Sequence, residues 1–253
     1  MRIIISFTSY PPRMDAVPAM VQTLLTQVPA PDLVVLYLAE SQFPGKKLPA
    51  STTDLMAKEK KFEVRWVPKD TRAHKKLTPA LIDFPDDIII TADDDVLYPA
   101  DWLARLMTAH KKYPNAVIGH HVYRMRPDKP YRKWRKIQNH WRRRVLFGRP
   151  SFKNFATGCG GILYPPHALY KDVLKEELFM DLAPTADDVW FWAMAVLNGT
   201  KIAIVSNPIK HLEEQENTQD CALWADNAVD DRNNKFLAAI MERYPEIKRN
   251  YRG

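Results

Sequence analysis

The sequence predicts an α/β fold in which a Rossmann-like, mostly parallel sheet is flanked by helices. Short apolar runs alternate with longer helix-compatible stretches through the first half of the chain. Several runs are continuously apolar, as Ile-Ile-Ile is at both 3–5 and 88–90, and strands buried on both faces have this pattern. In such a sheet, ligands bind beyond the carboxyl ends of the strands, so we expect the functional residues there.

In the first half, the apolar runs predict strands at Ile3–Phe7, Leu33–Leu38, Phe62–Val67 and Ile88–Thr91. The stretches between them predict helices at Met14–Gln27, Ser51–Lys58 and Lys75–Ile82. In the second half, helices are expected at Ala100–Tyr113, Pro166–Glu177, Thr185–Leu197 and Val229–Tyr244, and strands at Gly160–Leu163 and Lys201–Val205. Residues 124–153 fit neither period, and we expect a loop, an irregular helix or a mobile segment there.

Composition excludes several classes of protein. A chain of 253 residues with 46% hydrophobic and 26% charged residues is neither disordered nor fibrous. Cys159 and Cys221 belong to no CxxC pattern, so neither a disulfide framework nor a zinc site is indicated. The longest apolar run, Val189–Leu197, is far shorter than the ~20 residues of a membrane span. We therefore expect a soluble protein in a reducing, cytoplasmic compartment.

Three consecutive acids, Asp93, Asp94 and Asp95, follow the predicted strand Ile88–Thr91. If the extended geometry continues, Asp93 and Asp95 project to one side and Asp94 to the other. Two carboxylates on one side of a strand end suit a hard divalent cation that keeps positions open for phosphates. Alternatively, Asp95 or Asp101 caps the helix that follows. We favour the metal site, because three acids exceed what a cap needs.

Glycines are concentrated after Thr157, where three of the chain's eight fall within residues 158–161. The backbone there either takes positive φ or lets another group approach closely. Gly160 and Gly161 therefore belong to a loop packed against a bound sugar, or to a tight turn that leads into the next strand.

Two acids, Asp187 and Asp188, open a strongly apolar helix. Thr185 and Asp188 have the spacing of a capping box, which is one interpretation. The other is a carboxylate base presented to a cleft. His211 follows the predicted strand Lys201–Val205, and this position makes it a candidate metal ligand, although a lone His is more often a surface or core residue.

Taken in order, these motifs resemble those of bacterial glycosyltransferases of the GT-A fold. The resemblance extends from Ile3 to about His211 and rests on five segments: Ile3–Arg13, Lys75–Ala80, Asp93–Asp95 with Tyr98-Pro99, Thr157–Gly161 and Ala186–Asp188. It implies a single domain over residues 1–253, with a nucleotide-binding half at about 1–98 and an acceptor half at about 99–253.

The resemblance also implies residue roles. The nucleotide of a nucleotide-sugar donor is contacted by Thr8, Ser9, Tyr10, Arg13, Lys75 and Lys76, and the donor site includes Asp93, Asp94, Gly160 and Gly161. Asp95, with Asp93 and His211, holds Mn²⁺ or Mg²⁺ against the pyrophosphate. Asp188 matches the catalytic base of inverting members, and Asp187 orients the acceptor or donor. Many relatives have Glu at the position of Asp187, so the reach of this carboxylate is shorter here.

The net charge of +7 is unevenly distributed. Residues 124–153 contain twelve Lys or Arg and one acid, Asp128, so this segment carries +11 and the rest of the chain −4. Tyr131, Trp134 and Trp141 lie among these cations. Such a basic aromatic surface suits anionic lipid headgroups or a phosphorylated acceptor, and the alternative is a solvated charged face.

We therefore expect a metal-dependent, inverting hexosyltransferase of polysaccharide biosynthesis. It transfers a hexose, with UDP as the expected donor nucleotide, to a hydroxyl of a surface glycan or lipid-linked saccharide at the inner face of the cytoplasmic membrane. A sugar nucleotidyltransferase is the first alternative, but no Gly-rich phosphate loop is present because no glycine precedes Gly45. A basic nucleic-acid-binding module is the second, but it leaves both acidic motifs unexplained, and no nucleic-acid partner is expected.

Overall fold

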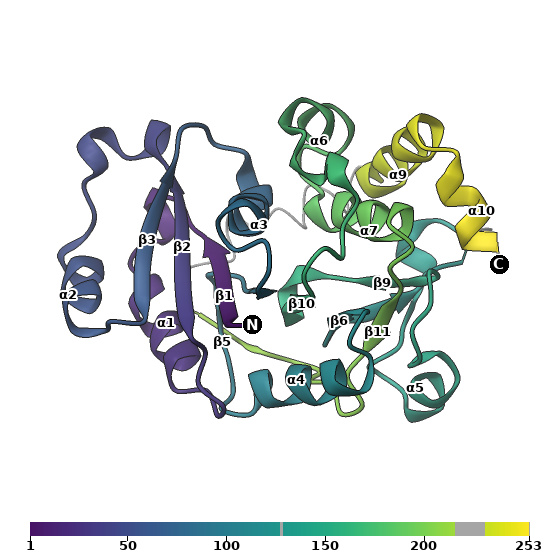
Figure 1. Ribbon diagram of the computed structural model, residues 1–253, viewed down its shortest axis with the longest axis horizontal. Coiled ribbons are helices and arrows are strands. Elements are labelled where there is room, and N and C mark those ends of the chain that lie inside the picture. Colours follow the sequence, from purple (N-terminus) through teal and green to yellow (C-terminus); the bar gives the residue numbers. More distant parts are fainter. Residues whose placement is uncertain (127–128, 216–230, 253) are drawn as a thin grey trace. The chain divides into compact units, whose positions relative to one another are not determined.

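A computed structural model describes residues 1–126, 129–215 and 231–252 of the chain (Figure 1). These residues divide into two compact units. The first unit contains residues 1–104 and 211–215, and the second contains residues 105–210 and 231–252. The functional division expected near residue 98 stays a prediction.

The first unit is built on four parallel strands in the order β4-β1-β2-β3. Their bounds are Ile3–Thr8 for β1, Leu33–Ala39 for β2, Phe62–Val67 for β3 and Ile88–Thr91 for β4. In the register, Ile5 pairs with both Val34 and Ile90, and all three side chains are fully buried. Burial on both faces explains the apolar runs of β1, β2 and β4, whereas β3 is half-buried and carries Glu63 and Arg65.

Helices of the first unit connect and cover these strands. They are α1 (Val17–Leu25), α2 (Ala50–Lys58) and α3 (Thr78–Asp83), with 3-10 turns η1 (Pro11–Arg13), η2 (Glu40–Gln42), η3 (Pro44–Lys46) and η4 (Arg72–Lys76). The buried residues of α1 are Val17, Met20, Val21 and Leu24, which recur at the spacing of one helical face. This face packs toward β2.

A short antiparallel pair adds a late segment of the chain to the first unit. It joins β5 (Val96–Leu97) to β12 (Glu213–Glu214). The backbone N–H of Gln215 donates to the carbonyl of Asp95 at 2.8 Å, and its side-chain amide donates to the carbonyl of Asp94 at 3.1 Å. The segment that begins at His211 therefore runs beside the three consecutive aspartates.

The second unit contains two groups of strands. In the first group β6 (Val117–Gly119) pairs parallel with β11 (Ile202–Ile204) and antiparallel with β10 (Ile162–Tyr164). In the second, β7 (Val122–Arg124) lies between β8 (Arg135–Lys136) and β9 (Asn154–Ala156), and all pairing is antiparallel.

Segment 124–153 is more regular than the sequence indicates. It forms the end of β7, η5 (Tyr131–Lys133), β8 and the helix α5 (Trp141–Phe147). Trp134 is buried and packs against Tyr131 and Phe155, with ring centroids 4.9 and 5.4 Å apart. These aromatic contacts order elements that are too short to produce a period in the sequence.

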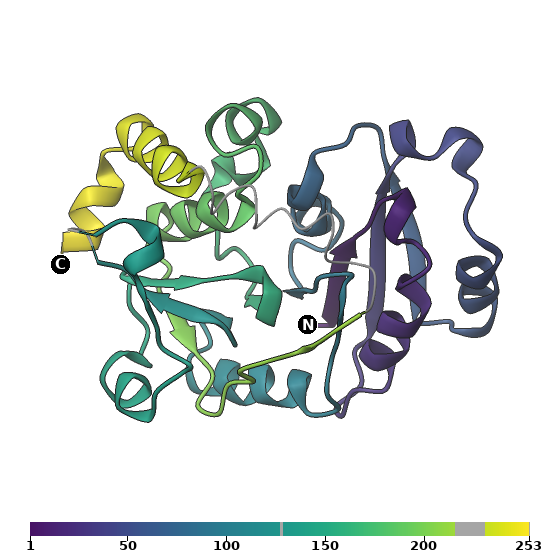
Figure 2. The same ribbon diagram turned by 180° about the vertical axis from the view of Figure 1, so that it is seen from behind.

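Several helices of the second unit pack against α7. Their bounds are α6 (Glu176–Leu182), α7 (Asp187–Leu197), α9 (Arg232–Arg243) and α10 (Glu246–Arg252), while α4 (Trp102–Lys112) begins in the first unit and continues into the second. Residues 189–196 of α7 are buried because α6, α9 and α10 pack against it (Figure 2).

The helix expected at Pro166–Glu177 is wrong. His167 has φ 56°, in the left-handed region, and the segment contains the 3-10 turn η7 (Lys171–Leu174) before α6 begins. Val229, the expected start of the last predicted helix, lies outside the described residues.

These elements confirm the α/β class, with a mostly parallel sheet flanked by helices. Among the residues that the structure describes, no helix has the length and apolar character needed to cross a membrane.

Candidate active site

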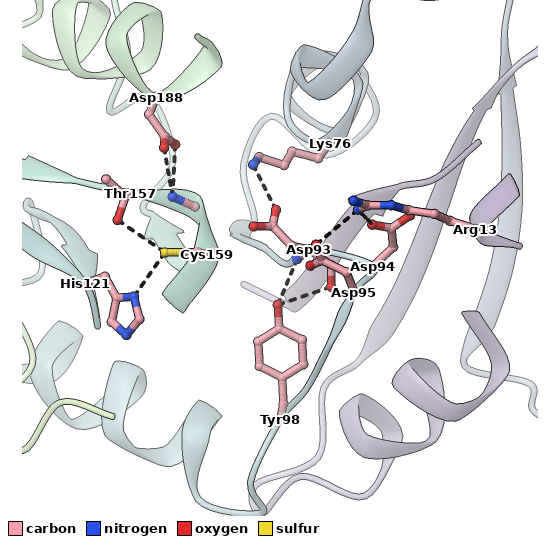
Figure 3. Close-up of polar contacts among 11 residues, drawn as sticks. Arg13, Lys76, Asp93, Asp94, Asp95, Tyr98, His121, Thr157, Cys159 and Asp188 are labelled. Atoms are coloured by element: carbon pink, nitrogen blue, oxygen red, sulfur yellow. Dashed lines mark hydrogen bonds and ion pairs between the residues drawn. The ribbon is translucent and has the colours of Figure 1, made fainter. Parts of the chain in front are cut away.

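The acid turn, residues Asp93–Asp95, follows the carboxyl end of β4. The expectation of continued extended geometry is wrong, because β4 ends at residue 91 and the chain turns at Asp94 and Asp95. Nη1 of Arg13 lies 2.9 Å from Asp94 Oδ1 and 3.1 Å from Asp95 Oδ2, so these two carboxylates converge on one atom (Figure 3). Asp95 does not cap α4, since that helix begins only at Trp102.

Asp94 is the buried member of the acid turn, with 6% of its surface exposed. Ser9 Oγ donates to Asp94 Oδ2 at 2.5 Å. Burial raises the pKa of the Asp94 carboxyl, although Arg13 and Ser9 oppose the shift. Thr8 is also held internally, through a hydrogen bond of 2.8 Å from its hydroxyl to the carbonyl of Tyr37. Contact of these residues with a nucleotide stays a prediction.

Lys75 and Lys76 are adjacent in the sequence but pair with different acids. Lys76 Nζ lies 3.0 Å from Asp93 Oδ1, and the backbone N–H of Asp93 donates to the hydroxyl of Tyr98 at 2.8 Å. Lys75 pairs with Asp70 instead. Burial lowers the pKa of Lys75, although Asp70 opposes the shift. Of the two, Lys76 forms an ion pair with the acid turn, and the charge of Asp94 also acts on Lys75.

Negative charge exceeds positive charge among the paired groups of the acid turn, because three carboxylates face Arg13 and Lys76. Burial raises the pKa of Asp95 to about 6, and the charges of Asp93 and Asp94 add to the rise. A divalent cation relieves this repulsion, and carboxylate oxygens are ligands that Mg²⁺ and Mn²⁺ prefer. The chemistry of the donor set therefore fits such an ion.

The predicted ligand set of Asp93, Asp95 and His211 is not assembled. Within residues 1–126, 129–215 and 231–252, no three His, Cys, Asp or Glu side chains are grouped so as to hold an ion. His211 is exposed, and the antiparallel register brings Gln215, four residues later, beside Asp95. The sequence shows a histidine after a strand, but it does not show where β12 pairs. Metal binding by Asp93 and Asp95 stays a prediction.

Tyr10 packs against Arg13, which pairs with the acid turn. The guanidinium carbon of Arg13 lies 5.7 Å from the centroid of the Tyr10 ring, within the range of a cation-π contact. Burial opposes the charge of Arg13, but Asp94 and Asp95 raise its pKa above the ordinary value. Arg13 therefore stays charged and links the loop after β1 to the acids.

In the second unit, Asp188 is bound to the glycine loop, residues Thr157–Gly161. The backbone N–H of Gly158 donates to both carboxylate oxygens of Asp188, at 3.0 and 3.1 Å (Figure 3). The helix α7 begins at Asp187 with Ala186 as N-cap, so Thr185 lies one residue before the N-cap position. Asp187 itself is buried, with 8% exposed. The structure thus brings together two motifs that lie thirty residues apart in the sequence.

Gly160 and Gly161 occupy positions where a larger residue would clash or be strained. A Cβ on Gly160 would lie 2.9 Å from both Cγ and the backbone nitrogen of His121. Gly161 has φ 82°, in the region that favours glycine. These observations favour the turn that leads into β10. Contact of Gly160 and Gly161 with a bound sugar stays a prediction.

Sequence reasoning missed His121, which lies just after β6. Its Nδ1 is 3.0 Å from Cys159 Sγ, and its Nε2 is 3.0 Å from the carbonyl of Ile209. Because a carbonyl only accepts, Nε2 carries the hydrogen and Nδ1 faces the thiol. The sole sequence signal is the His120-His121 pair at the end of a short apolar run.

Two tyrosines add an aromatic surface near Asp188. Burial raises the pKa of Tyr123 to about 12, with contributions from Cys159 and Asp188. Burial also raises the pKa of Tyr131, whose ring centroid lies 5.8 Å from that of Tyr123. Both hydroxyls are therefore protonated at neutral pH.

A depression of about 460 Å³ in the first unit lies elsewhere. It is lined by Tyr37, Arg65, Trp66, Val67, Pro79, Ile82 and Asp83. None of these residues belongs to the acid turn or to the predicted nucleotide contacts, so shape alone does not identify the site.

Comparison with solved structures identifies two similar folds. The mannosyltransferase PcManGT from Pyrobaculum calidifontis, in complex with GDP-Man and Mn²⁺, matches at a TM-score of 0.57 and 14% identity, over 94% of this chain and 64% of that protein. Residues 1–349 of TarS from S. aureus match at a TM-score of 0.52 and 13% identity, over 96% of this chain and 72% of that one. The chain has a GT-A fold. No protein-family model and no curated protein sequence matches it.

Within the GT-A fold, the acid turn occupies the place where an α/β sheet binds ligands, at the carboxyl end of a parallel strand. The chain spans 64% of the mannosyltransferase, so the likeness concerns the shared fold and not that whole protein.

Proposed function

We propose that the chain is a metal-dependent, inverting glycosyltransferase that transfers a hexose from a nucleotide-sugar to a hydroxyl of a surface glycan or lipid-linked saccharide. The observation that carries the proposal is the acid turn, where three carboxylates face two cations at the end of β4. The GT-A fold supports it, because a mannosyltransferase of that fold was solved with GDP-Man and Mn²⁺.

On the donor side, Asp95 and Asp93 would hold Mn²⁺ or Mg²⁺. When bound, the ion supplies Lewis-acid neutralisation of the charge on the leaving diphosphate. Lys76 lies 3.0 Å from Asp93 and supplies a further cation for phosphate oxygens. Arg13 holds Asp94 and Asp95 in place through its two ion pairs. UDP is the expected nucleotide, and GDP is tested beside it because of the mannosyltransferase.

On the acceptor side, Asp188 takes the proton from the acceptor hydroxyl as the oxygen bonds to the anomeric carbon. Attack on the face opposite the leaving diphosphate inverts the configuration. The N–H of Gly158 orients the carboxylate, and a carboxylate accepts up to about four hydrogen bonds, so this anchoring is compatible with binding a hydroxyl. Asp187, at the first residue of α7, orients acceptor or donor.

The proposal is tested by incubating the protein with UDP-, GDP- and CMP-sugars, Mn²⁺ and a panel of saccharide and lipid-linked acceptors. Acceptor-dependent release of a nucleoside diphosphate, with an inverted product anomer by NMR, supports it. Retained configuration overturns the assigned role of Asp188. Release of pyrophosphate from a nucleoside triphosphate and a sugar phosphate, without transfer, identifies a nucleotidyltransferase and overturns the proposal.

A further inference from the structure

Exposed apolar side chains are concentrated on α5. Among the described residues, seven large apolar side chains are exposed, and three of them lie on this seven-residue helix. Trp141 is 60% exposed, Val145 71% and Leu146 70%. Single exposed apolar residues are ordinary on a protein surface, whereas a contiguous group marks an interaction site.

The apolar group points outward because the arginines of α5 bind the preceding segment. Nη1 of Arg143 donates to the carbonyl of Lys136 at 3.1 Å, and Nη1 of Arg144 donates to the carbonyl of Gln138 at 3.2 Å. Trp141 and Val145 are one helical turn apart and share a face. In Figures 1 and 2, α5 lies at the outer edge of its unit.

Trp134 and Tyr131 do not belong to this surface, although they lie in the same basic segment. Trp134 is 7% exposed and packs on Phe155, and its indole N–H donates to the carbonyl of Lys129 at 3.1 Å. The aromatic surface expected from the sequence thus separates into a buried cluster and the exposed Trp141.

Positive charge is concentrated on both sides of the exposed group in the sequence. Residues 129–153 contain ten Lys or Arg and no acid. Six of these cations are exposed close to α5 in the sequence: Arg132, Lys133, Arg135, Lys136, Arg142 and Arg149. The guanidinium of Arg142 lies 5.5 Å from the Trp141 ring centroid. We call these six cations with Trp141, Val145 and Leu146 the α5 surface.

We propose that the α5 surface docks the protein on an anionic lipid bilayer. Exposed Trp, Val and Leu side chains enter the boundary between headgroups and acyl chains, while the surrounding cations bind anionic headgroups. A merely solvated charged face does not explain why three large apolar side chains are exposed on one short helix. A nucleic-acid surface uses cations and aromatic rings, but it leaves Val145 and Leu146 without a role.

The test is co-sedimentation of the full chain with vesicles of phosphatidylcholine alone and of phosphatidylcholine with phosphatidylglycerol. The protein should bind only the anionic vesicles, and less at high salt. The triple variant W141S/V145S/L146S should lower binding about tenfold or more. The double variant R132Q/R135Q should lower it by about 25-fold, since each cation contributes about fivefold.

Matched controls alter exposed residues elsewhere. V28S/I82S/L174S removes three exposed apolar side chains, and K58Q/K60Q removes two exposed cations. Both should bind anionic vesicles like the wild type, and circular dichroism should show every variant folded. Equal binding to neutral and anionic vesicles, equal losses in the controls, or tight binding of a short oligonucleotide with no vesicle binding would overturn the proposal. No readout requires transferase activity, so its failure is distinguishable from failure of the proposed function.

Discussion

Asp188 accepts the backbone N–H of Gly158 through both carboxylate oxygens, at 3.0 and 3.1 Å. Asp188 lies in the first turn of α7 and Gly158 begins the 3-10 turn η6 (Gly158–Gly160), so one donor fixes the acid against the glycine loop. The acid is therefore oriented before any substrate binds, which is what a general base requires.

Asp188→Asn should lower turnover by about 10²–10⁴-fold while nucleotide binding survives, because an amide keeps the Gly158 contact but takes no proton. The measurement is kcat beside the affinity for a nucleoside diphosphate. Asp181→Asn, which alters an exposed acid on α6, serves as the control and should keep wild-type turnover. Unchanged turnover in Asp188→Asn excludes the base assignment.

Arg13→Gln should destabilise the fold by about 3–5 kcal/mol, because it leaves the buried Asp94 without its counter-ion. Chemical denaturation measures the loss. The double variant with Arg13→Gln and Asp94→Asn should lose less unfolding free energy than the sum of the losses in the two single variants.

Arg65→Gln is the matched control for Arg13→Gln. Arg65 also pairs with two acids, Glu63 and Asp83, but its side chain is 34% exposed, so its loss should cost about 1 kcal/mol or less. Two results would contradict the role of Arg13 as the counter-ion of Asp94. One is an equal loss of unfolding free energy in Arg13→Gln and Arg65→Gln, and the other is strict additivity of the losses from Arg13→Gln and Asp94→Asn.

Asp95→Asn should raise the melting temperature in EDTA at neutral pH. Burial and the neighbouring carboxylates raise the pKa of Asp95 to about 6, so its ionised form is disfavoured by the fold. A gain of about 1 kcal/mol corresponds to about 2–4 °C for a chain of this size. Asp54→Asn, at an exposed position on α2, should change nothing. A lower melting temperature for Asp95→Asn than for the wild type in EDTA argues against charge repulsion between Asp95 and the neighbouring carboxylates.

Gly160→Ala should destabilise the protein by about 1–3 kcal/mol, because its Cβ would lie 2.9 Å from His121. Gly199→Ala is the comparison: it meets nothing within 4 Å but has φ 76°, so it isolates the cost of positive φ, about 1 kcal/mol. Thermal unfolding measures both. A wild-type melting temperature for Gly160→Ala would contradict the prediction, because it would show that the glycine loop accommodates the added Cβ without loss of stability.

The sequence predicts β1 to β4 to within a residue or so, chiefly because burial on both faces of β1, β2 and β4 produces continuous apolar runs. It does not predict β5 or β12, which are two residues long. It predicts β8 and α5 poorly, because these depend on packing around Trp134 and Phe155. The helix expected from Pro166 fails for a backbone reason, the left-handed φ of His167, which no periodicity reveals.

At the candidate site, the residue types in the sequence indicate which acids are functional candidates. Only the tertiary structure shows which residues pair with these acids. The structure shows that the guanidinium of Arg13 joins Asp94 and Asp95, and contact of Arg13 with a nucleotide stays a prediction. Antiparallel pairing of β12 brings Gln215 beside Asp95, and metal binding by His211 also stays a prediction. Contacts between residues eighty or more positions apart leave no spacing signal in a single sequence.

Binding of a nucleoside diphosphate to the acid turn together with a divalent cation is tested by calorimetric titration of UDP and GDP with and without Mn²⁺. We expect one of them to bind only when Mn²⁺ is present, and we expect that binding to be lost in Asp95→Asn and retained in Asp188→Asn. Binding that is independent of metal, or that is equal in Asp95→Asn and the wild type, would contradict it.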